Sequence, residues 1–330
     1  MIYRLSIPAK FMLVGEYSVL DGFTSLSASI DLFMQLEAKI LDSDESIISS
    51  DIWQTPYIGV LGQDKPSPEK SLLIDALFQA CTFYKIKSLD LKVQSGWDIS
   101  SGFGSSSALR LGLFLICAAI AKGSCNLATH EQWLSAKQAF KQQKKAQGFA
   151  SGYDIATQLI GGLVSFTTEN ETWPKLAVCH DDLAKNLSDQ VHIFYGGQGS
   201  DTKKIGSSTL MWLNQNERKK TLQSLSLNLR QELLLSLQKP TPSTSLFTAC
   251  SKHRQFFMQS PAYPKELFQG VEALPGLDIL WSFKSTGAGG EDAILVFGQK
   301  ESLFAVEHYL DKKGWKRQLA HFPAQGCYFS

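Results

Sequence analysis

The chain has 330 residues, of which 44% are hydrophobic and 19% are charged. Its 32 Lys and Arg residues nearly balance its 31 Asp and Glu residues, so the formal net charge at pH 7 is +1. This composition excludes an intrinsically disordered chain, and it lacks the basic excess of proteins that coat nucleic acids. The length predicts one large domain or two of ordinary size.

The longest strongly apolar run extends from Leu111 to Ala121. It is shorter than the roughly 18 to 20 residues that cross a bilayer, so we expect no membrane span. The first residues show no basic segment followed by an apolar one, as a secretory signal peptide would. The six cysteines are scattered and form no CxxC pair. This pattern predicts buried free thiols in a reducing cytoplasm.

In chain order, the first half predicts extended structure with a break at Pro8, a hairpin turn at Asp21-Gly22, and alternating strands and helices after it. A Gly/Ser cluster over residues 100–107 runs directly into a long buried helix. The other expected elements here are strands over 29–40, 89–93 and 163–166, and helices over 71–84, 130–147 and the residues after a Gly-rich turn at 148–152.

The pattern turns polar over residues 182–189 and a new apolar strand begins at residue 191, so we place a domain boundary there, giving domains 1–190 and 191–330. The second half predicts helices over 212–237, 245–257 and 301–312, and strands over 279–283 and 293–297 on either side of a Gly-rich turn. The alternation of strands and helices is irregular, which favours the α+β class over α/β.

The most informative segment is Ser101-Gly-Phe-Gly-Ser-Ser-Ser-Ala108. Its small residues allow close approach of a ligand to the backbone, and the helix that follows would aim N–H groups and its dipole at an anion. An ordinary loop whose serines cap the helix is the alternative. No Lys follows the glycines, so the segment is not a Walker A loop, and the protein-kinase motifs are absent.

Three further segments carry chemistry, each with a plain structural alternative. Lys10 lies beside the break at Pro8, where it could meet a phosphate or a carboxylate, or simply be solvated. Asp154 follows the Gly-rich turn, where it could orient or deprotonate a hydroxyl, or cap the helix. The segment from Lys284 to Asp292 could close over a phosphate, or form a turn between two strands.

Taken in order from Pro8 to Asp292, these four segments resemble the motifs of the GHMP small-molecule kinases, a superfamily that includes galactokinases, homoserine kinases, mevalonate kinases and phosphomevalonate kinases. The phosphomevalonate kinases are the most similar group, because of Tyr17, the sequence SGYDIA around Asp154, and Lys284 with Asp292 flanking the last glycines.

The chain also departs from the family pattern. Phe103 and Ser107 replace Leu and Ala of the glycine-serine loop, and Glu291 stands where the family usually has Gly. Gln143 falls where mevalonate kinases place a Mg²⁺-binding Glu, which leaves the acidic metal ligand unassigned.

The resemblance implies a two-domain α+β fold, with a ribosomal-protein S5-like N-terminal domain, a ferredoxin-like C-terminal domain, and an active site in the cleft between them. It implies ATP and Mg²⁺ as cofactors. Asp154 would meet the acceptor oxygen as base or orienter, and Lys10 beside it would hold its pKa low. The other implied contacts are phosphate binding by Gly102, Gly104, Ser105, Ser106 and Ser107, Mg²⁺ ligation by Ser106, and substrate binding by Glu16, Tyr17, Gly287, Ala288 and Gly289.

The reaction that the resemblance implies is phosphoryl transfer from ATP to 5-phosphomevalonate, giving 5-diphosphomevalonate for isoprenoid synthesis in the mevalonate pathway. A mevalonate kinase or another GHMP kinase is the first alternative, and a ligand-binding regulator of the same fold is a non-enzymatic one. We expect a cytoplasmic monomer or homodimer whose partner is a small acceptor molecule, with no nucleic acid and no membrane. The segment from Gly196 to Thr202 is a weaker candidate for contact with the acceptor.

Overall fold

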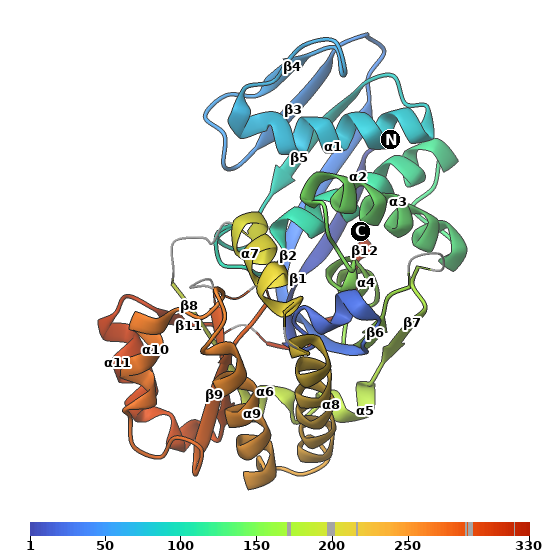
Figure 1. Cartoon of the computed structure of the whole chain (residues 1–330). Helices are drawn as coiled ribbons and strands as arrows, with labels where there is room; N and C mark the ends of the chain where they lie inside the picture. The colour runs from blue at the N-terminus through green and yellow to red at the C-terminus, as the bar shows by residue number, and fades with distance from the viewer. Residues whose placement is uncertain (170–172, 197–201, 216, 288, 290–292, 320) are drawn as a thin grey trace.

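The computed structural model describes residues 1–169, 173–196, 202–215, 217–287, 289, 293–319 and 321–330. In this part of the chain the strands form two separate sheets, one of eight strands and one of four. Figure 1 shows the large sheet and its helices at the top and the small sheet with the later helices at the bottom.

The large sheet is built around a long antiparallel pair, β1 (Tyr3–Val14) and β2 (Ser25–Ile40). Its main path has the order β12-β1-β2-β5-β3-β4, while β6 pairs with β2 and β7 with β6. The remaining strands are β3 (Ser46–Ser50), β4 (Tyr57–Gly59), β5 (Leu89–Gln94), β6 (Leu163–Thr167), β7 (Leu176–Cys179) and β12 (Tyr328–Phe329).

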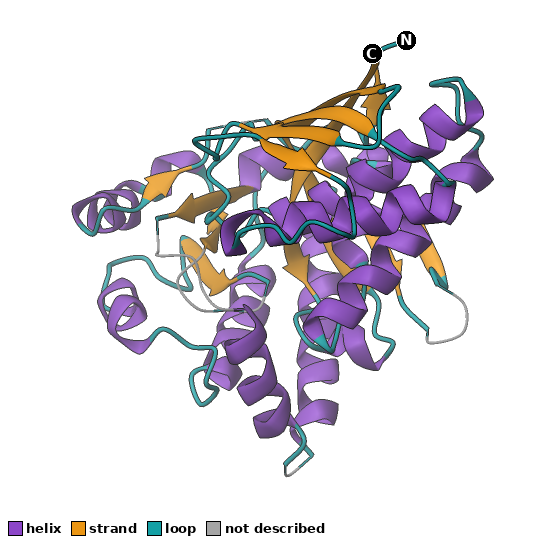
Figure 2. Ribbon diagram, turned by 90° about the horizontal axis from the view of Figure 1, so that it is seen from above, coloured by secondary structure: helices purple, strands orange, loops and turns teal. Residues whose placement is uncertain are grey.

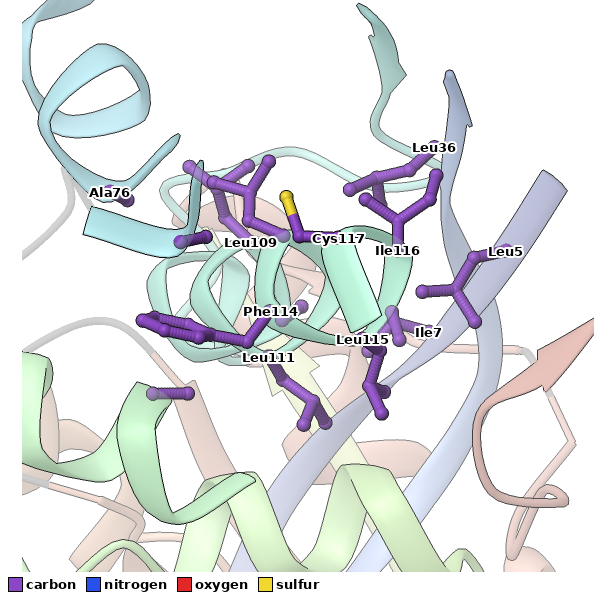
Figure 3. Close-up of a cluster of buried hydrophobic side chains, with 14 of the residues drawn as sticks. Leu5, Ile7, Leu36, Ala76, Leu109, Leu111, Phe114, Leu115, Ile116 and Cys117 are labelled. Atoms are coloured by element: carbon purple, nitrogen blue, oxygen red, sulfur yellow. The ribbon is translucent and has the colours of Figure 1, made fainter. Parts of the chain in front are cut away.

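The central helix of the fold is α2 (Ser105–Lys122), whose residues from Ser107 to Ile120 are all buried. Figure 3 shows Leu111, Leu115 and Ile116 of this helix facing Leu5 and Ile7 of β1 and Leu36 of β2. The helices packed around it are α1 (Pro68–Tyr84), α3 (Thr129–Gln147) and α4 (Tyr153–Ile160). In the described residues, α2 is the one helix long and apolar enough to cross a membrane, but 78% of it is buried inside the fold, as in a core helix.

The small sheet is antiparallel and has the order β11-β8-β10-β9. Its strands are β8 (Val191–Tyr195), β9 (Trp281–Ser285), β10 (Ala293–Gly298) and β11 (Lys316–Arg317). The helices of this half are α5 (Asp181–Ala184), α6 (Leu187–Gln190), α7 (Thr202–Leu213), α8 (Arg218–Ser236), α9 (Thr244–Phe257), α10 (Lys265–Glu272) and α11 (Phe304–Lys312).

The C-terminal residues return to the large sheet. Tyr328 and Phe329 pair with β1, and the Ser330 N–H donates to the carbonyl of Arg4 at 3.1 Å. The two termini therefore lie side by side (Figure 2). The strand β8 begins at the residue where the sequence predicted a second domain, whereas β12 belongs to the first sheet, and the division at residue 190 stays a prediction.

Three sequence predictions were wrong in detail. Pro8 does not interrupt β1; the strand continues through it with a shift in register between Pro8 and Ala9, where the lost N–H donor is tolerated. Asp21-Gly22 does not form a two-residue hairpin, because residues 15–24 connect β1 to β2 through a short 3-10 helix (Ser18–Asp21). The helix predicted from residue 212 is broken after Leu213, and Glu217 has a left-handed φ of 56° before α8 begins.

The central position of α2 gives a test of the core. Leu111→Ala removes a side chain that is 0% exposed, and we expect it to lower the free energy of unfolding by about 2–5 kcal/mol. The matched control is Leu134→Ala on α3, where the side chain is 45% exposed and the loss should be about 1 kcal/mol or less. Urea unfolding measures both, and equal losses would contradict the assignment of α2 as the core helix.

Candidate active site

A cavity of about 330 Å³ lies where the end of β1, the first turns of α2 and α4, and the end of β9 meet. Nearly all the predicted site residues line it, although they come from four distant parts of the sequence. These residues are Lys10, Glu16, Tyr17, Gly102, Gly104, Ser105, Ser106, Ser107, Asp154 and Gly287.

Other predicted residues do not line the cavity. Gly289 is not among its lining residues, and a Cβ at this position would lie 2.7 Å from the side chain of Ala262. Ala288, Gly290–Asp292 and residues 197–201 of the weaker acceptor segment lie outside the described residues.

The glycine-serine loop is fixed to β1 by Lys10. The Lys10 N–H donates to the carbonyl of Phe103 at 3.0 Å, and the Lys10 ammonium donates to the carbonyl of Gly102 at 3.3 Å. Gly104 has a φ of +86° and a Cβ there would lie 2.6 Å from Cε of Lys10, so only glycine fits this turn. The loop therefore holds Lys10 directly against the start of α2.

The first turn of α2 points at the cavity. Gly104 is the N-cap residue and no side chain caps the helix, so its first N–H groups are available to a ligand. The Ser107 hydroxyl turns back onto the carbonyl of Gly104, at 2.9 Å. A Gly-rich turn with open N–H groups at a helix N-terminus, lined by serines and one lysine, is suited to phosphate groups.

Asp154 is the second residue of α4 and not its N-cap, which is Gly152. One carboxylate oxygen accepts a hydrogen bond from the Gln143 amide at 2.7 Å, and the other accepts from the N–H of Ile155 at 3.0 Å. Because an amide donor holds a carboxylate without protonating it, Gln143 fixes the direction of Asp154. The carboxylate can therefore orient a hydroxyl group or accept its proton.

A buried ion pair lies beside the cavity and joins the two sheets. The Lys284 ammonium of β9 donates to Glu16, and both side chains are at most 4% exposed. Burial raises the pKa of Glu16 above its usual value, and the charge of Lys284 counters part of that effect. Close by, the Thr286 hydroxyl donates to the carbonyl of Met12 at 2.6 Å, so the chain at the end of β9 is tied to the chain at the end of β1 at two points.

His253 of α9 is a buried residue of this region that the sequence analysis missed. Its ring nitrogen lies 3.9 Å from the carboxylate of Glu16, and neither ring nitrogen has a hydrogen-bond partner in the described structure. Burial, with the charge of Lys284, holds the pKa of His253 well below its usual value, so the ring is neutral. No local motif marks a single histidine in an amphipathic helix, so the sequence offered no signal for it.

Tyr17 closes another side of the cavity. It has a left-handed φ of 57°, and its ring lies 6.3 Å from the ring of Phe257 in α9. Burial raises the pKa of Tyr17 to about 12, so its phenol stays protonated at neutral pH. A residue from the first half of the chain thus packs against helices of the second half at the edge of the site.

The described residues around Ser106 do not fit a Mg²⁺ ion held by the protein. Mg²⁺ is usually bound by one or two carboxylates together with phosphate oxygens and water. Here the guanidinium of Arg110 donates to the Ser106 hydroxyl, and the neutral Gln143 amide occupies one oxygen of Asp154. A fixed cation on the Ser106 hydroxyl repels a second one. No group of three or more His, Cys, Asp or Glu residues suited to a metal occurs in the described ranges.

The ion pair gives a stability test. Glu16→Gln leaves the Lys284 ammonium buried without its countercharge, and we expect a loss of about 3–5 kcal/mol in the free energy of unfolding. The double variant Glu16→Gln with Lys284→Met should recover most of this loss, because it removes both buried charges. Glu37→Gln breaks the exposed pair with Arg4 and should cost about 1 kcal/mol or less. If the loss of unfolding free energy in the double variant equals the sum of the losses in the two single variants, the two side chains are not coupled.

No family model matches the sequence. Two curated relatives match the sequence, and both are mevalonate kinases. The mevalonate kinase of Saccharolobus solfataricus is 25% identical over 185 residues, and that of Pyrococcus furiosus is 26% identical over 171 residues. The alignments cover 53% and 49% of this chain and 55% and 50% of the relatives. The chain therefore matches about half the length of these relatives.

Solved structures match over almost the whole chain. A Lin0012 protein from Listeria innocua has a TM-score of 0.78 at 18% identity, covering 100% of this chain and 99% of that one. A mevalonate kinase has a TM-score of 0.73 at 19% identity, with coverages of 100% and 99%. Streptococcus pneumoniae phosphomevalonate kinase, in complex with phosphomevalonate and AMPPNP, has a TM-score of 0.72 at 16% identity, with coverages of 97% and 99%.

These likenesses show the fold. The chain has the fold of the GHMP kinases, and both the predicted α+β class and the resemblance to this superfamily are confirmed.

Proposed function

We propose that this protein is an ATP-dependent small-molecule kinase of the GHMP type. The observation that carries the proposal is the meeting of an uncapped helix N-terminus, a lysine and an oriented carboxylate in one cavity. The helix N-terminus suits the phosphates of a nucleotide, and the carboxylate suits the acceptor oxygen that attacks the transferred phosphate. Phosphoryl transfer depends mainly on positioning and charge stabilisation, which these groups supply.

Each group has a definite part in the proposed reaction. The N–H groups of Ser105 and Ser106 at the start of α2 would bind the oxygens of the transferred phosphate. The Lys10 ammonium, held on the loop by Gly102, would stabilise the charge that develops between donor and acceptor. Asp154, directed by Gln143, would orient the acceptor oxygen and take its proton if it carries one.

The proposed acceptor is mevalonate or 5-phosphomevalonate. Tyr17 and Lys284 in the motifs favour the phosphorylated molecule, as the sequence analysis set out. The described cavity favours mevalonate, because Lys10 is the one cationic side chain among its described lining residues. Lys284, which lies next to the cavity, is paired with Glu16, so it adds little positive charge for a second anionic group. Both curated relatives are mevalonate kinases.

The proposal predicts ADP release from ATP that depends on the acceptor. We would offer mevalonate and 5-phosphomevalonate in parallel, with and without Mg²⁺, and follow ADP by a coupled assay. We expect ADP release with one of the two acceptors. If the charge of the cavity determines which acceptor binds, ADP release should be faster with mevalonate. Tight ATP binding with no ADP release for either acceptor, or for other small alcohols, would favour a ligand-binding regulator.

Asp154→Asn tests the role of the carboxylate. The substitution keeps the shape and the bond to Gln143 but removes the charge, so we expect kcat to fall about 100-fold or more with little change in ATP affinity. Asp182→Asn, at an exposed position of α5, is the matched control and should leave kcat unchanged. An Asp154→Asn enzyme with wild-type kcat would remove Asp154 from the mechanism.

A further inference from the structure

Tyr153 lines the site cavity beside Asp154, but the proposed reaction gives it no part. It is the first residue of α4 and follows Gly152, whose φ is +78°. A Cβ at Gly152 would lie 2.6 Å from the ring of Phe140 and 2.7 Å from the indole nitrogen of Trp173. This turn is closely packed, and it therefore fixes the backbone from which the Tyr153 side chain extends.

The ring of Tyr153 contacts the Lys10 ammonium. Lys10 Nζ lies over the ring, 5.4 Å from its centroid, within the roughly 6 Å over which an aromatic face attracts a cation. Lys10 is 6% exposed, so water screens this attraction little. The same ammonium donates to the carbonyl of Gly102 at 3.3 Å. The ammonium thus contacts the glycine-serine loop and the Tyr153 ring at once.

The phenol of Tyr153 is neutral at physiological pH. Burial raises its pKa well above the usual value, and the charges of Asp154 and Glu16 add to that effect. The attraction to Lys10 is therefore that of a neutral aromatic face, and not that of a phenolate. A phenylalanine at this position would offer the same kind of face, whereas an aliphatic side chain would not.

We propose that Tyr153 is a positioning residue, whose ring face holds the Lys10 ammonium where charge develops during phosphoryl transfer. The proposal rests on the proposed function, in which Lys10 stabilises that charge. Lysine has a flexible four-carbon stem, so each added contact restricts the positions of its ammonium. A cation that is already in place stabilises a transition state without the cost of reorientation. The first turn of α4 thus directs both Asp154 and, through Tyr153, Lys10.

Two variants separate the ring from the hydroxyl. Tyr153→Phe keeps the aromatic face, so kcat for ADP release should stay within about 3-fold of the wild type. Tyr153→Leu removes the face and keeps an apolar side chain, so kcat should fall about 10-fold or more. The acceptor is whichever of mevalonate and 5-phosphomevalonate the wild type turns over. Isothermal titration with a non-hydrolysable ATP analogue should give dissociation constants that differ little among the three proteins.

Tyr84→Leu is the matched control, because it makes the same change at a partly buried tyrosine of α1 that does not line the site cavity. It should leave kcat unchanged. Thermal unfolding shows whether each variant is folded and separates a loss of folded protein from a loss of turnover. If Tyr153→Leu does not fold, Tyr153→Met takes its place with the same expected fall, because the longer and more adaptable side chain fills more of the space.

Two outcomes overturn the proposal. A folded Tyr153→Leu or Tyr153→Met protein with wild-type kcat shows that the ring does not position Lys10. A Tyr153→Phe protein that loses as much kcat as Tyr153→Leu assigns the effect to the hydroxyl. Both outcomes leave the kinase proposal intact, because the wild type still releases ADP. No acceptor-dependent ADP release by the wild type would contradict the kinase proposal and this one together.

Discussion

The buried pair of Glu16 and Lys284 is the interaction on which the site depends. It is formed between a residue after β1 and a residue of β9, and it lies beside the cavity between the two sheets. Together with the bond from Thr286 to Met12, it holds the small sheet against the strand that carries Lys10. This link fixes the glycine-serine loop relative to the last glycine segment, alongside the buried apolar cluster that packs β1 against β8 and β10.

The parts of the site that could be predicted are those whose chemistry is local in the sequence. The loop from Gly102 to Ser107 could be recognised because small residues directly before an apolar helix are required for close approach to an anion. Asp154 could be recognised because it follows a Gly-rich turn at a helix start. In each case a few adjacent residues determine both the backbone geometry and the chemistry. The order of the motifs along the chain was therefore enough to identify these site residues.

The parts that could not be predicted depend on contacts between distant residues. Lys284 is 268 residues from Glu16, and His253 comes from a helix with no motif of its own. Arg110 directly precedes the apolar run from Leu111 to Ala121 and belongs to no motif, although it lies one helical turn after Ser106 and donates to its hydroxyl. The strand β12 has two residues, too few for a periodic pattern, and only its pairing with β1 defines it.

The most direct measurement is a crystal structure of the protein with a non-hydrolysable ATP analogue and mevalonate. We expect the terminal phosphate to lie on the first N–H groups of α2, near Lys10, with an acceptor oxygen between that phosphate and the carboxylate of Asp154. A nucleotide bound elsewhere, or an acceptor turned away from Asp154, would contradict the central claim that this cavity is a phosphoryl-transfer site.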